Sequence, residues 1–290
     1  MRALVVGGTG TLCGMIVRRL LGHRNELSIL VLPASDAGAL IQAGARPVPG
    51  DLTDHRSLHG ACAGVDVVIT TANSALRGGA DTVESVDLVG NRDLIDAARA
   101  QGVRQFVFVS ALGASSQSPS PFMRAKAATE AHLRKSGLRY TILQPNLFME
   151  AWIPMLLGPA AAGGTEVTLA GEGRRRHSFV SIEDVAAYAV AVAGKATARD
   201  RTLALGGAEP VSWRGIVAEL EKTIGRRLDV RHLAPGESLP GLPPVVSELA
   251  WAMELFDSPV DMTKLSQEFG IRPTALEEYV RRALGRAVPA

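Results

Sequence analysis

A glycine-rich loop near the start of the chain most narrows the folds open to it. The apolar run Ala3–Val6 ends at Gly7, and the stretch GGTGTLCG leads directly into an amphipathic segment, Leu12–Leu21. Glycines at a strand-to-helix turn let the backbone approach a pyrophosphate, and the helix N-terminus directs free N–H groups and a partial positive charge at it. A tight turn without a ligand is the alternative. The position of the loop at the first strand–helix junction favours a dinucleotide site.

Short apolar runs alternate with helical patterns through the first 145 residues. The expected strands are Ala3–Val6, Leu27–Leu32, Val65–Thr70, Gln105–Val109 and Tyr140–Leu143, and the expected helices include Leu12–Leu21, Thr82–Ala100 and Arg124–Lys135. This order predicts βαβ units and an α/β fold with a Rossmann-type doubly wound parallel sheet. We expect a nucleotide-binding domain at 1–145 and a smaller, mostly helical substrate lobe with returning sheet segments at 146–290. The stretch 156–165 is the candidate linker.

Composition excludes several classes of protein. Hydrophobic residues make up 47% of the 290 and charged residues 21%, which is the balance of a folded domain. A net charge of +2 does not favour nucleic acid or a membrane surface as a partner. The chain has no apolar run that could span a bilayer, its start is unlike a signal peptide, and two cysteines provide no disulfide framework. We therefore expect a cytoplasmic protein. A small-molecule partner and a monomeric or homodimeric state are expected as well.

Further motifs give the chain a family resemblance. The spacing Gly7-x-x-Gly10, then GDLTDHRSL (50–58), GVRQFVFVSALGA (102–114) and FMRAKAATEAHLRKSGLRYTILQPNLFME (122–150), resembles the atypical short-chain dehydrogenases/reductases, especially their NmrA-like branch. The third glycine of that family's loop is replaced by Cys13, which is small enough for the helix to stay close to the strand. The resemblance continues through RRRHSFVSIEDVAAYA (174–189) and is weak beyond about residue 195.

The resemblance implies an NAD(P) site. We expect the cofactor to contact Gly7, Thr9, Gly10, Thr11, Leu12, Ser35, Asp51, Leu52, Ala72, Asn73, Lys126 and Pro145. At the end of the second strand, a carboxylate would bind the ribose of NAD and an arginine would bind the 2′-phosphate of NADP. The chain has LVLPASD there. The lack of an acid at the strand end, together with the hydroxyl of Ser35, favours NADP(H) over NAD(H).

A lysine and a serine are the candidate catalytic residues. In the related reductases a tyrosine protonates the substrate oxygen, a lysine follows four residues later, and a serine binds the same oxygen. Lys126 and Ser110 match the lysine and the serine, whereas Phe122 replaces the tyrosine and Asp87 replaces an asparagine that often completes the set. Lys126 could be a surface lysine, a ribose anchor in a protein without turnover, or a support for reduction. In the last case the proton comes from Lys126, from water or from the substrate.

The resemblance also implies a hydrophobic substrate site, formed by Phe122, Phe148, Met149 and Trp152. The function expected is that of an NAD(P)H-dependent reductase, acting on a carbonyl or quinone-like group of a hydrophobic, ring-containing molecule such as a secondary-metabolite ketone. The alternative is a redox-sensing regulator that binds NAD(P) without turnover and acts through a protein partner. His55 and His59 have a metal-ligand spacing but no third ligand nearby, so no metal site is expected.

Overall fold

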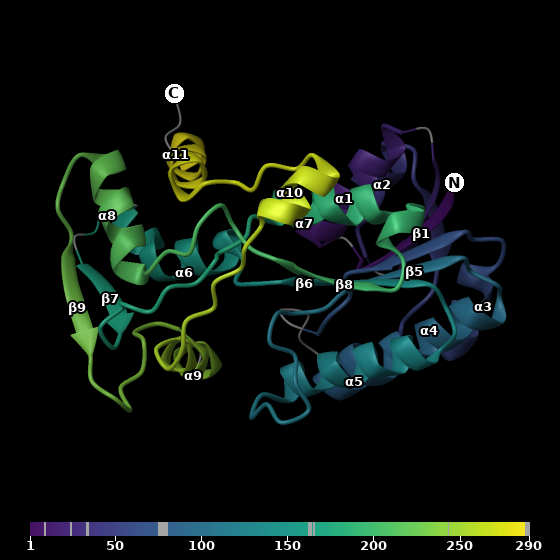
Figure 1. Cartoon of the computed structure of the whole chain (residues 1–290), viewed down its shortest axis with the longest axis horizontal. Coiled ribbons are helices and arrows are strands. Elements are labelled where there is room, and N and C mark those ends of the chain that lie inside the picture. Colours follow the sequence, from purple (N-terminus) through teal and green to yellow (C-terminus); the bar gives the residue numbers. More distant parts are fainter. Residues whose placement is uncertain are drawn as a thin grey trace. The chain divides into compact units, whose positions relative to one another are not determined.

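The computed structural model describes residues 1–8, 10–23, 25–32, 35–74, 81–161, 164, 166–242 and 244–287, without the side chains of 156–161, 244–245 and 285–287 (Figure 1). The chain forms two compact units. Unit 1 contains Met1–Pro145 and Val185–Ala204, and unit 2 contains Asn146–Asp184 and Leu205–Ala290. The segment Val185–Ala204 thus groups with the first unit, whereas the sequence-based division assigned all of 146–290 to the second.

Unit 1 is built on a seven-stranded sheet with the strand order β3-β2-β1-β4-β5-β6-β8. The strands are β1 (Arg2–Val6), β2 (Glu26–Val31), β3 (Arg46–Pro49), β4 (Val67–Thr70), β5 (Gln105–Val109), β6 (Tyr140–Pro145) and β8 (Arg201–Leu205). The pairs β1–β2, β1–β4, β2–β3, β4–β5 and β5–β6 are parallel. The strand order reverses beside β1, and doubly wound folds bind dinucleotides at that point. The predicted Rossmann-type fold is confirmed.

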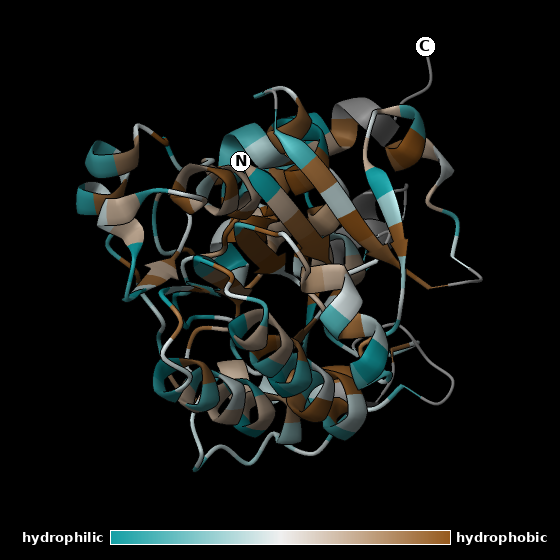
Figure 2. Ribbon diagram, turned by 90° about the vertical axis from the view of Figure 1, so that its right-hand side faces the viewer, coloured by the Kyte–Doolittle hydropathy of each residue, from teal (hydrophilic) through white to brown (hydrophobic). Residues whose placement is uncertain are grey.

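Helices cover both faces of this sheet (Figure 1). They are α1 (Thr11–Leu21), α2 (Gly38–Gln42) and α7 (Ile182–Val192) on one face, and α3 (His55–Cys62), α4 (Asn91–Ala100) and α5 (Pro121–Lys135) on the other. Alternate side chains of a strand point to opposite faces, so Leu4 and Val6 of β1 pack with Leu58 of α3 and Leu94 of α4. Figure 2 shows the hydrophobic residues gathered on the strands. A short 3₁₀ turn, η2 (Ala196–Ala198), precedes β8.

The helix expected at Thr82–Ala100 is present, but its first part is a π-helix, η1 (Val83–Gly90), which continues into α4. Thr82 and Ser85 cap its start reciprocally, with Thr82 Oγ1 accepting from the backbone of Ser85 and Ser85 Oγ accepting from the backbone of Thr82. Gly90 ends it. A Cβ atom at Gly90 would lie 2.9 Å from Cβ of Leu52, so the close approach of this helix to the loop after β3 requires glycine.

Unit 2 contains a two-stranded parallel sheet, β7 (Glu166–Ala170) with β9 (Asp229–Leu233). Its helices are α6 (Met149–Ala161), α8 (Trp213–Ile224), α9 (Pro244–Met253), α10 (Thr263–Phe269) and α11 (Leu276–Ala287). Phe179 and Trp213 pack edge to face in its core, with ring centroids 5.1 Å apart. The linker expected at 156–165 is wrong as far as Ala161, because α6 continues to that residue despite Gly158 and Pro159. Residues 162, 163 and 165 lie outside the described residues. In the described part of the chain, no helix is long and apolar enough to cross a membrane.

Candidate functional site

The loop after β1 has the geometry of a phosphate-binding turn. Gly7 and Gly8 both have positive φ, 150° and 60°. A Cβ atom at Gly7 would lie 2.1 Å from Oγ1 of Thr71, in the loop after β4, so only glycine lets the two loops approach this closely. Gly10 is the N-cap of α1, without a side-chain cap and without an acidic residue in the first turn. The first N–H groups of the helix are therefore available to an anion. Thr9 lies outside the described residues.

Cys13 occupies the position of the third loop glycine and is fully buried between α1 and the sheet. Burial raises the pKa of its thiol, and that of the buried Cys62 thiol on α3, to about 12. Both thiols are thus protonated and serve as small core side chains, as the sequence led us to expect for Cys13.

The two buried thiols predict a loss of stability in alkali. Their unfolded pKa is 9.0 and their folded pKa is about 12, so the unfolded state releases its protons first and stability falls as the pH rises above 9.0. By about pH 10, each thiol should lower the free energy of unfolding by about 1.4 kcal/mol. Denaturant titrations should show that the free energy of unfolding of the wild-type protein falls between about pH 8 and about pH 10. This fall should be about 3 kcal/mol larger than that of the variant Cys13→Ala/Cys62→Ala. If the stability of both proteins depended on pH in the same way, the raised pKa values assigned to the two thiols would be wrong.

The loops after β2 and β3 hold three residues expected at the cofactor. Ser35 Oγ donates to the carbonyl of Leu32 at 2.9 Å, so its single proton is used within its own turn. Asp51 Oδ1 accepts from the backbone N–H of Thr53 at 2.9 Å, and Leu52 is buried beneath η1. These loops follow strands that run parallel to β1, and they therefore lie at the same sheet edge as the glycine loop.

The ends of β4 and β6 hold the other residues expected at the cofactor. Ala72 is buried, and Asn73 Nδ2 donates to the carbonyl of Thr71 at 3.2 Å. Pro145 is buried and its carbonyl accepts from the N–H of Leu112 at 2.9 Å. Taken with the glycine loop, this edge of unit 1 provides an uncapped helix N-terminus and two closely packed loops. Such an arrangement fits the diphosphate of a dinucleotide.

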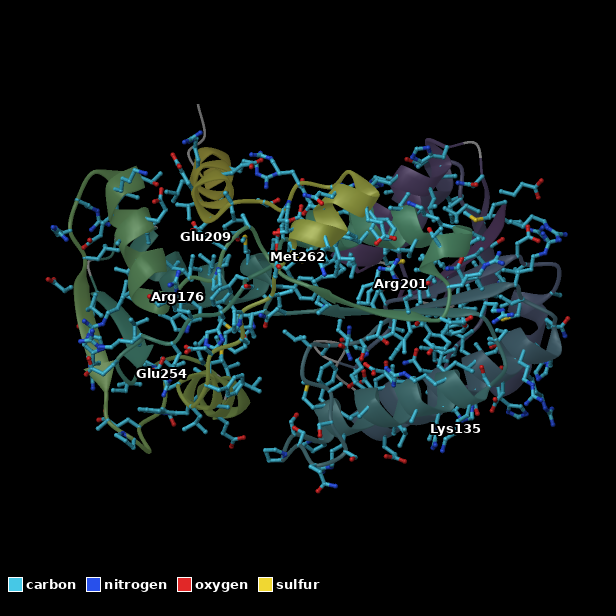
Figure 3. The ribbon with its side chains drawn as sticks, viewed as in Figure 1. Lys135, Arg176, Arg201, Glu209, Glu254 and Met262 are labelled. Carbon is cyan, nitrogen blue, oxygen red and sulfur yellow. The ribbon has the colours of Figure 1, made fainter. Side chains whose placement is uncertain are left out.

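Lys126 is buried in unit 1, with 2% of its surface exposed. Its Nζ lies 3.2 Å from Oδ1 of Asp87, which is fully buried on η1. The rings of Phe108 and Phe122 lie 5.1 and 5.2 Å from the same nitrogen, within cation–π range. Lys135, at the end of the same helix, points outwards and away from the sheet (Figure 3). The surface-lysine interpretation of Lys126 is therefore wrong.

Burial lowers the pKa of Lys126, because desolvation disfavours the ammonium. The negative charges of Asp87 and Glu130 oppose this shift. The ion pair with Asp87 therefore fixes the position of the Lys126 side chain.

Ser110 and Glu130 form a second buried pair. Ser110 Oγ donates to Oε1 of Glu130 at 2.5 Å, and Gln144 Nε2 donates to the same oxygen at 2.8 Å. Arg134 donates to Oε2 at 2.9 Å. A hydroxyl has one proton, so Ser110 can donate to a substrate oxygen only after it leaves Glu130.

Four residues of this site were not predicted from the sequence: Glu130 and Gln144, and also Ser74 and Thr129, which both donate hydrogen bonds to Asp87. A signal for Glu130 was present, because it follows Lys126 by four residues and therefore lies on the same face of α5. Thr129 follows Lys126 by three residues and gives the same helical signal, whereas Ser74 and Gln144 reach the site through pairing between separate segments, which local spacing does not reveal.

The residues expected to line the substrate site are divided between the two units. Phe122 is half-buried in unit 1. In unit 2, Met149 is 2% exposed in the core, and the ring of Trp152 lies 6.4 Å from that of Trp213. Phe148 forms a bridge with Val180. Their contact with a substrate stays a prediction. Among the described residues, no cluster of three histidine, cysteine or acidic side chains is arranged to hold a metal.

Comparisons with known proteins agree with this geometry. Residues 7–196 match the family model described as NAD(P)H-binding. The NAD(P)H azoreductase of Xenophilus azovorans is 31% identical over 232 residues, covering 80% of this chain and 76% of that protein. Photosystem II assembly factor Ycf39 of Synechocystis is 29% identical and is covered over 92% of its length, with 99% of this chain aligned.

A solved structure resembles the whole chain. The NADPH-dependent quinone oxidoreductase of Escherichia coli is 25% identical, with a TM-score of 0.79 over 98% of this chain and 99% of the enzyme. The same enzyme has been solved in complex with NADPH. The protein therefore belongs to the NAD(P)H-binding family, and its fold is that of the atypical short-chain dehydrogenases/reductases.

Proposed function

We propose that this protein is an NAD(P)H-dependent reductase of a carbonyl or quinone-like group in a hydrophobic, ring-containing small molecule. The observation that carries the proposal is the glycine loop. There Gly7 packs against Thr71, and the N-terminus of α1 is left without a cap. Two relatives support the reaction class, because one is a quinone oxidoreductase and another is an azoreductase.

The absence of an acidic residue at the end of β2 supports NADP(H) as the preferred cofactor. The first carboxylate after that strand is Asp36, and its Oδ1 accepts from the N–H of Gly38 at 3.0 Å. Asp36 therefore closes a local turn just before α2, whose N-cap is Ala37 and not Asp36 as the sequence suggested. Ser35 adds nothing to this preference while its proton is bonded to Leu32.

A quinone fits the residues around Lys126 better than a simple ketone does. When bound, the nicotinamide supplies a hydride. A reduced quinone carries its charge as a phenolate-like oxygen, whose conjugate acid has a pKa near 10, so it needs no strong acid beside it. Phe122 provides an apolar wall without a proton, and Lys126 provides a fixed positive charge. In this proposal water supplies the proton.

A second candidate function is binding of NAD(P)H without turnover, with action through a protein partner. It is favoured by the similarity of the whole chain to the assembly factor Ycf39. The engagement of Ser110 with Glu130 and of Lys126 with Asp87 also agrees with a site that binds more than it catalyses.

An acceptor screen separates the two functions. Purified protein with NADPH or NADH is offered quinones, azo dyes and aromatic ketones, and cofactor oxidation is followed by absorbance. A reductase should oxidise NADPH faster with quinones than with ketones, in proportion to protein concentration. Saturable cofactor binding without oxidation by any acceptor would favour the second function, and a lack of binding would reject both.

A further inference from the structure

Asp87 joins the buried lysine to the loop after β4. Its Oδ2 accepts from the backbone N–H of Ser74 at 2.9 Å and from Oγ of Ser74 at 2.6 Å. Its Oδ1 faces Nζ of Lys126 at 3.2 Å. Thr129, on the same helix as Lys126, donates to the backbone carbonyl of Asp87 at 2.9 Å. The carboxylate of Asp87 thus bonds to Ser74 of the loop through one oxygen and pairs with Lys126 through the other.

Asn91 holds the same loop one helical turn later. Its Nδ2 donates to the carbonyl of Ala72 at 3.3 Å and to that of Val86 at 2.9 Å, and its Oδ1 accepts from Thr70 Oγ1 at 3.0 Å. Asn91 is fully buried, so each of these bonds is shielded from water. Asp87 and Asn91 belong to the junction of η1 and α4, and π-helical turns occur frequently at functional sites.

The loop that these residues hold is the one that contacts the glycine turn. The N–H of Thr71 donates to the carbonyl of Val6 at 2.8 Å, and Gly7 leaves no room for a side chain beside Oγ1 of Thr71. Ala72 and Asn73 follow directly. A displacement of 70–74 therefore changes the surface on which a dinucleotide is expected to lie.

We propose that Asp87 and Asn91 form a clamp that positions loop 70–74 for the nucleotide, and that Lys126 acts on cofactor binding through Asp87 instead of contacting the cofactor. This inference rests on the proposed function. Asp87 and Asn91 are positioning residues in it, and Lys126 supplies the charge that keeps the carboxylate of Asp87 in place.

Ser74→Ala tests the loop end of the clamp. This variant removes the hydroxyl bond to Asp87 and keeps the backbone bond, and Ser74 is only half-buried, so the fold should persist. We expect the Kd for NADPH, measured by calorimetry, to rise roughly 5-fold or more, within the range of ordinary coupling between sites. The control Lys135→Met, on the outer end of α5, should leave the Kd unchanged.

A second test asks whether Lys126 affects NADPH binding only through Asp87. It compares the effect of removing Lys126 in a protein that already lacks the Asp87 carboxylate. Asp87→Asn should also weaken NADPH binding, because its amide attracts Ser74 and Lys126 less strongly than a carboxylate does. If Lys126 acts only through Asp87, the variant Asp87→Asn/Lys126→Met should bind NADPH as well as Asp87→Asn alone. This pair carries no unpaired buried acid, so its fold does not depend on an uncompensated charge.

The outcomes distinguish this inference from the proposed function. A further loss of affinity in the double variant, or an unchanged Kd in Ser74→Ala, would overturn the clamp while the wild-type protein still binds NADPH. A wild-type protein that binds neither NADPH nor NADH would overturn the proposed function and the clamp together.

Discussion

Gly10→Asp is expected to abolish measurable NADPH binding while leaving the protein folded. Gly10 has φ −61° and ψ 150°, which any residue adopts, and a Cβ atom there would lie 3.4 Å from the carbonyl oxygen of Gly7. Aspartate is a good N-cap, so its carboxylate would accept the free N–H groups of α1 that we assign to the diphosphate. It would also repel the diphosphate. The affinity should fall by about 100-fold or more, since two like charges would compete for one partly desolvated site.

The expected stability of Gly10→Asp separates a loss of binding from a loss of folding. An N-cap carboxylate should raise the free energy of unfolding of the apoprotein by a few tenths to about 1 kcal/mol, although it removes binding. Gly10→Asn is the matched control, because it has the same size and no charge and should lose less affinity. Gly10→Asp with wild-type affinity for NADPH would show that the helix N-terminus is not the phosphate site.

Lys126→Met should destabilise the protein strongly. Removal of one partner from a buried ion pair leaves the other charge without compensation, and Asp87 is fully buried. We expect a loss of about 3 to 5 kcal/mol in the free energy of unfolding at neutral pH, measured by denaturant titration. The double variant Lys126→Met/Asp87→Asn should recover most of this loss, because neither remaining side chain is charged.

Lys135→Met provides the surface control for the same substitution on the same helix. Lys135 is exposed, so its replacement should change the free energy of unfolding by less than about 0.5 kcal/mol. If Lys126→Met lowered the free energy of unfolding no more than Lys135→Met, the ion pair with Asp87 would not contribute to stability.

The first unit could be predicted from the sequence because its signals are local. Strands buried on both faces are continuous apolar runs, as in β4 and β5, and the glycine loop marks the first turn between a strand and a helix. Returning sheet segments were expected within 146–290, but the sequence did not indicate which residues of unit 2 form them. Strand β9 is largely exposed and carries Asp229, Arg231 and His232, so its composition does not differ from that of a loop.

The π-helix could not be predicted from the sequence. The apolar residues of 82–100 suggest an ordinary helix, whereas the π-type turn is stabilised by the side chain of Asn91, which bonds to the carbonyls of Val86 and Ala72. A contact from a helix to the end of a neighbouring strand has no signature in local periodicity.

The candidate site could be predicted in part for the same reason. The helical spacing correctly places Phe122 and Lys126 together, with the ring 5.2 Å from the ammonium. The buried partners of Lys126 and Ser110 are harder to predict. In the sequence, Asp87 stands out only as a replaced asparagine, and Glu130 only by its helical spacing from Lys126. Asp87 and Glu130 are buried because of how the folded chain packs, and this packing cannot be seen in the sequence.

Transfer of the cofactor hydride is the measurement that tests the reductase assignment most directly. NADPH with deuterium at the transferred position of the nicotinamide is mixed with the protein and the best quinone from the screen. We predict protein-dependent oxidation that is slower with deuterated than with ordinary NADPH, loss of the deuterium from the cofactor, and no oxidation with Gly10→Asp. If wild-type protein binds NADPH saturably but every acceptor leaves the deuterium on the cofactor, the chain is a binding protein and the reductase assignment is wrong.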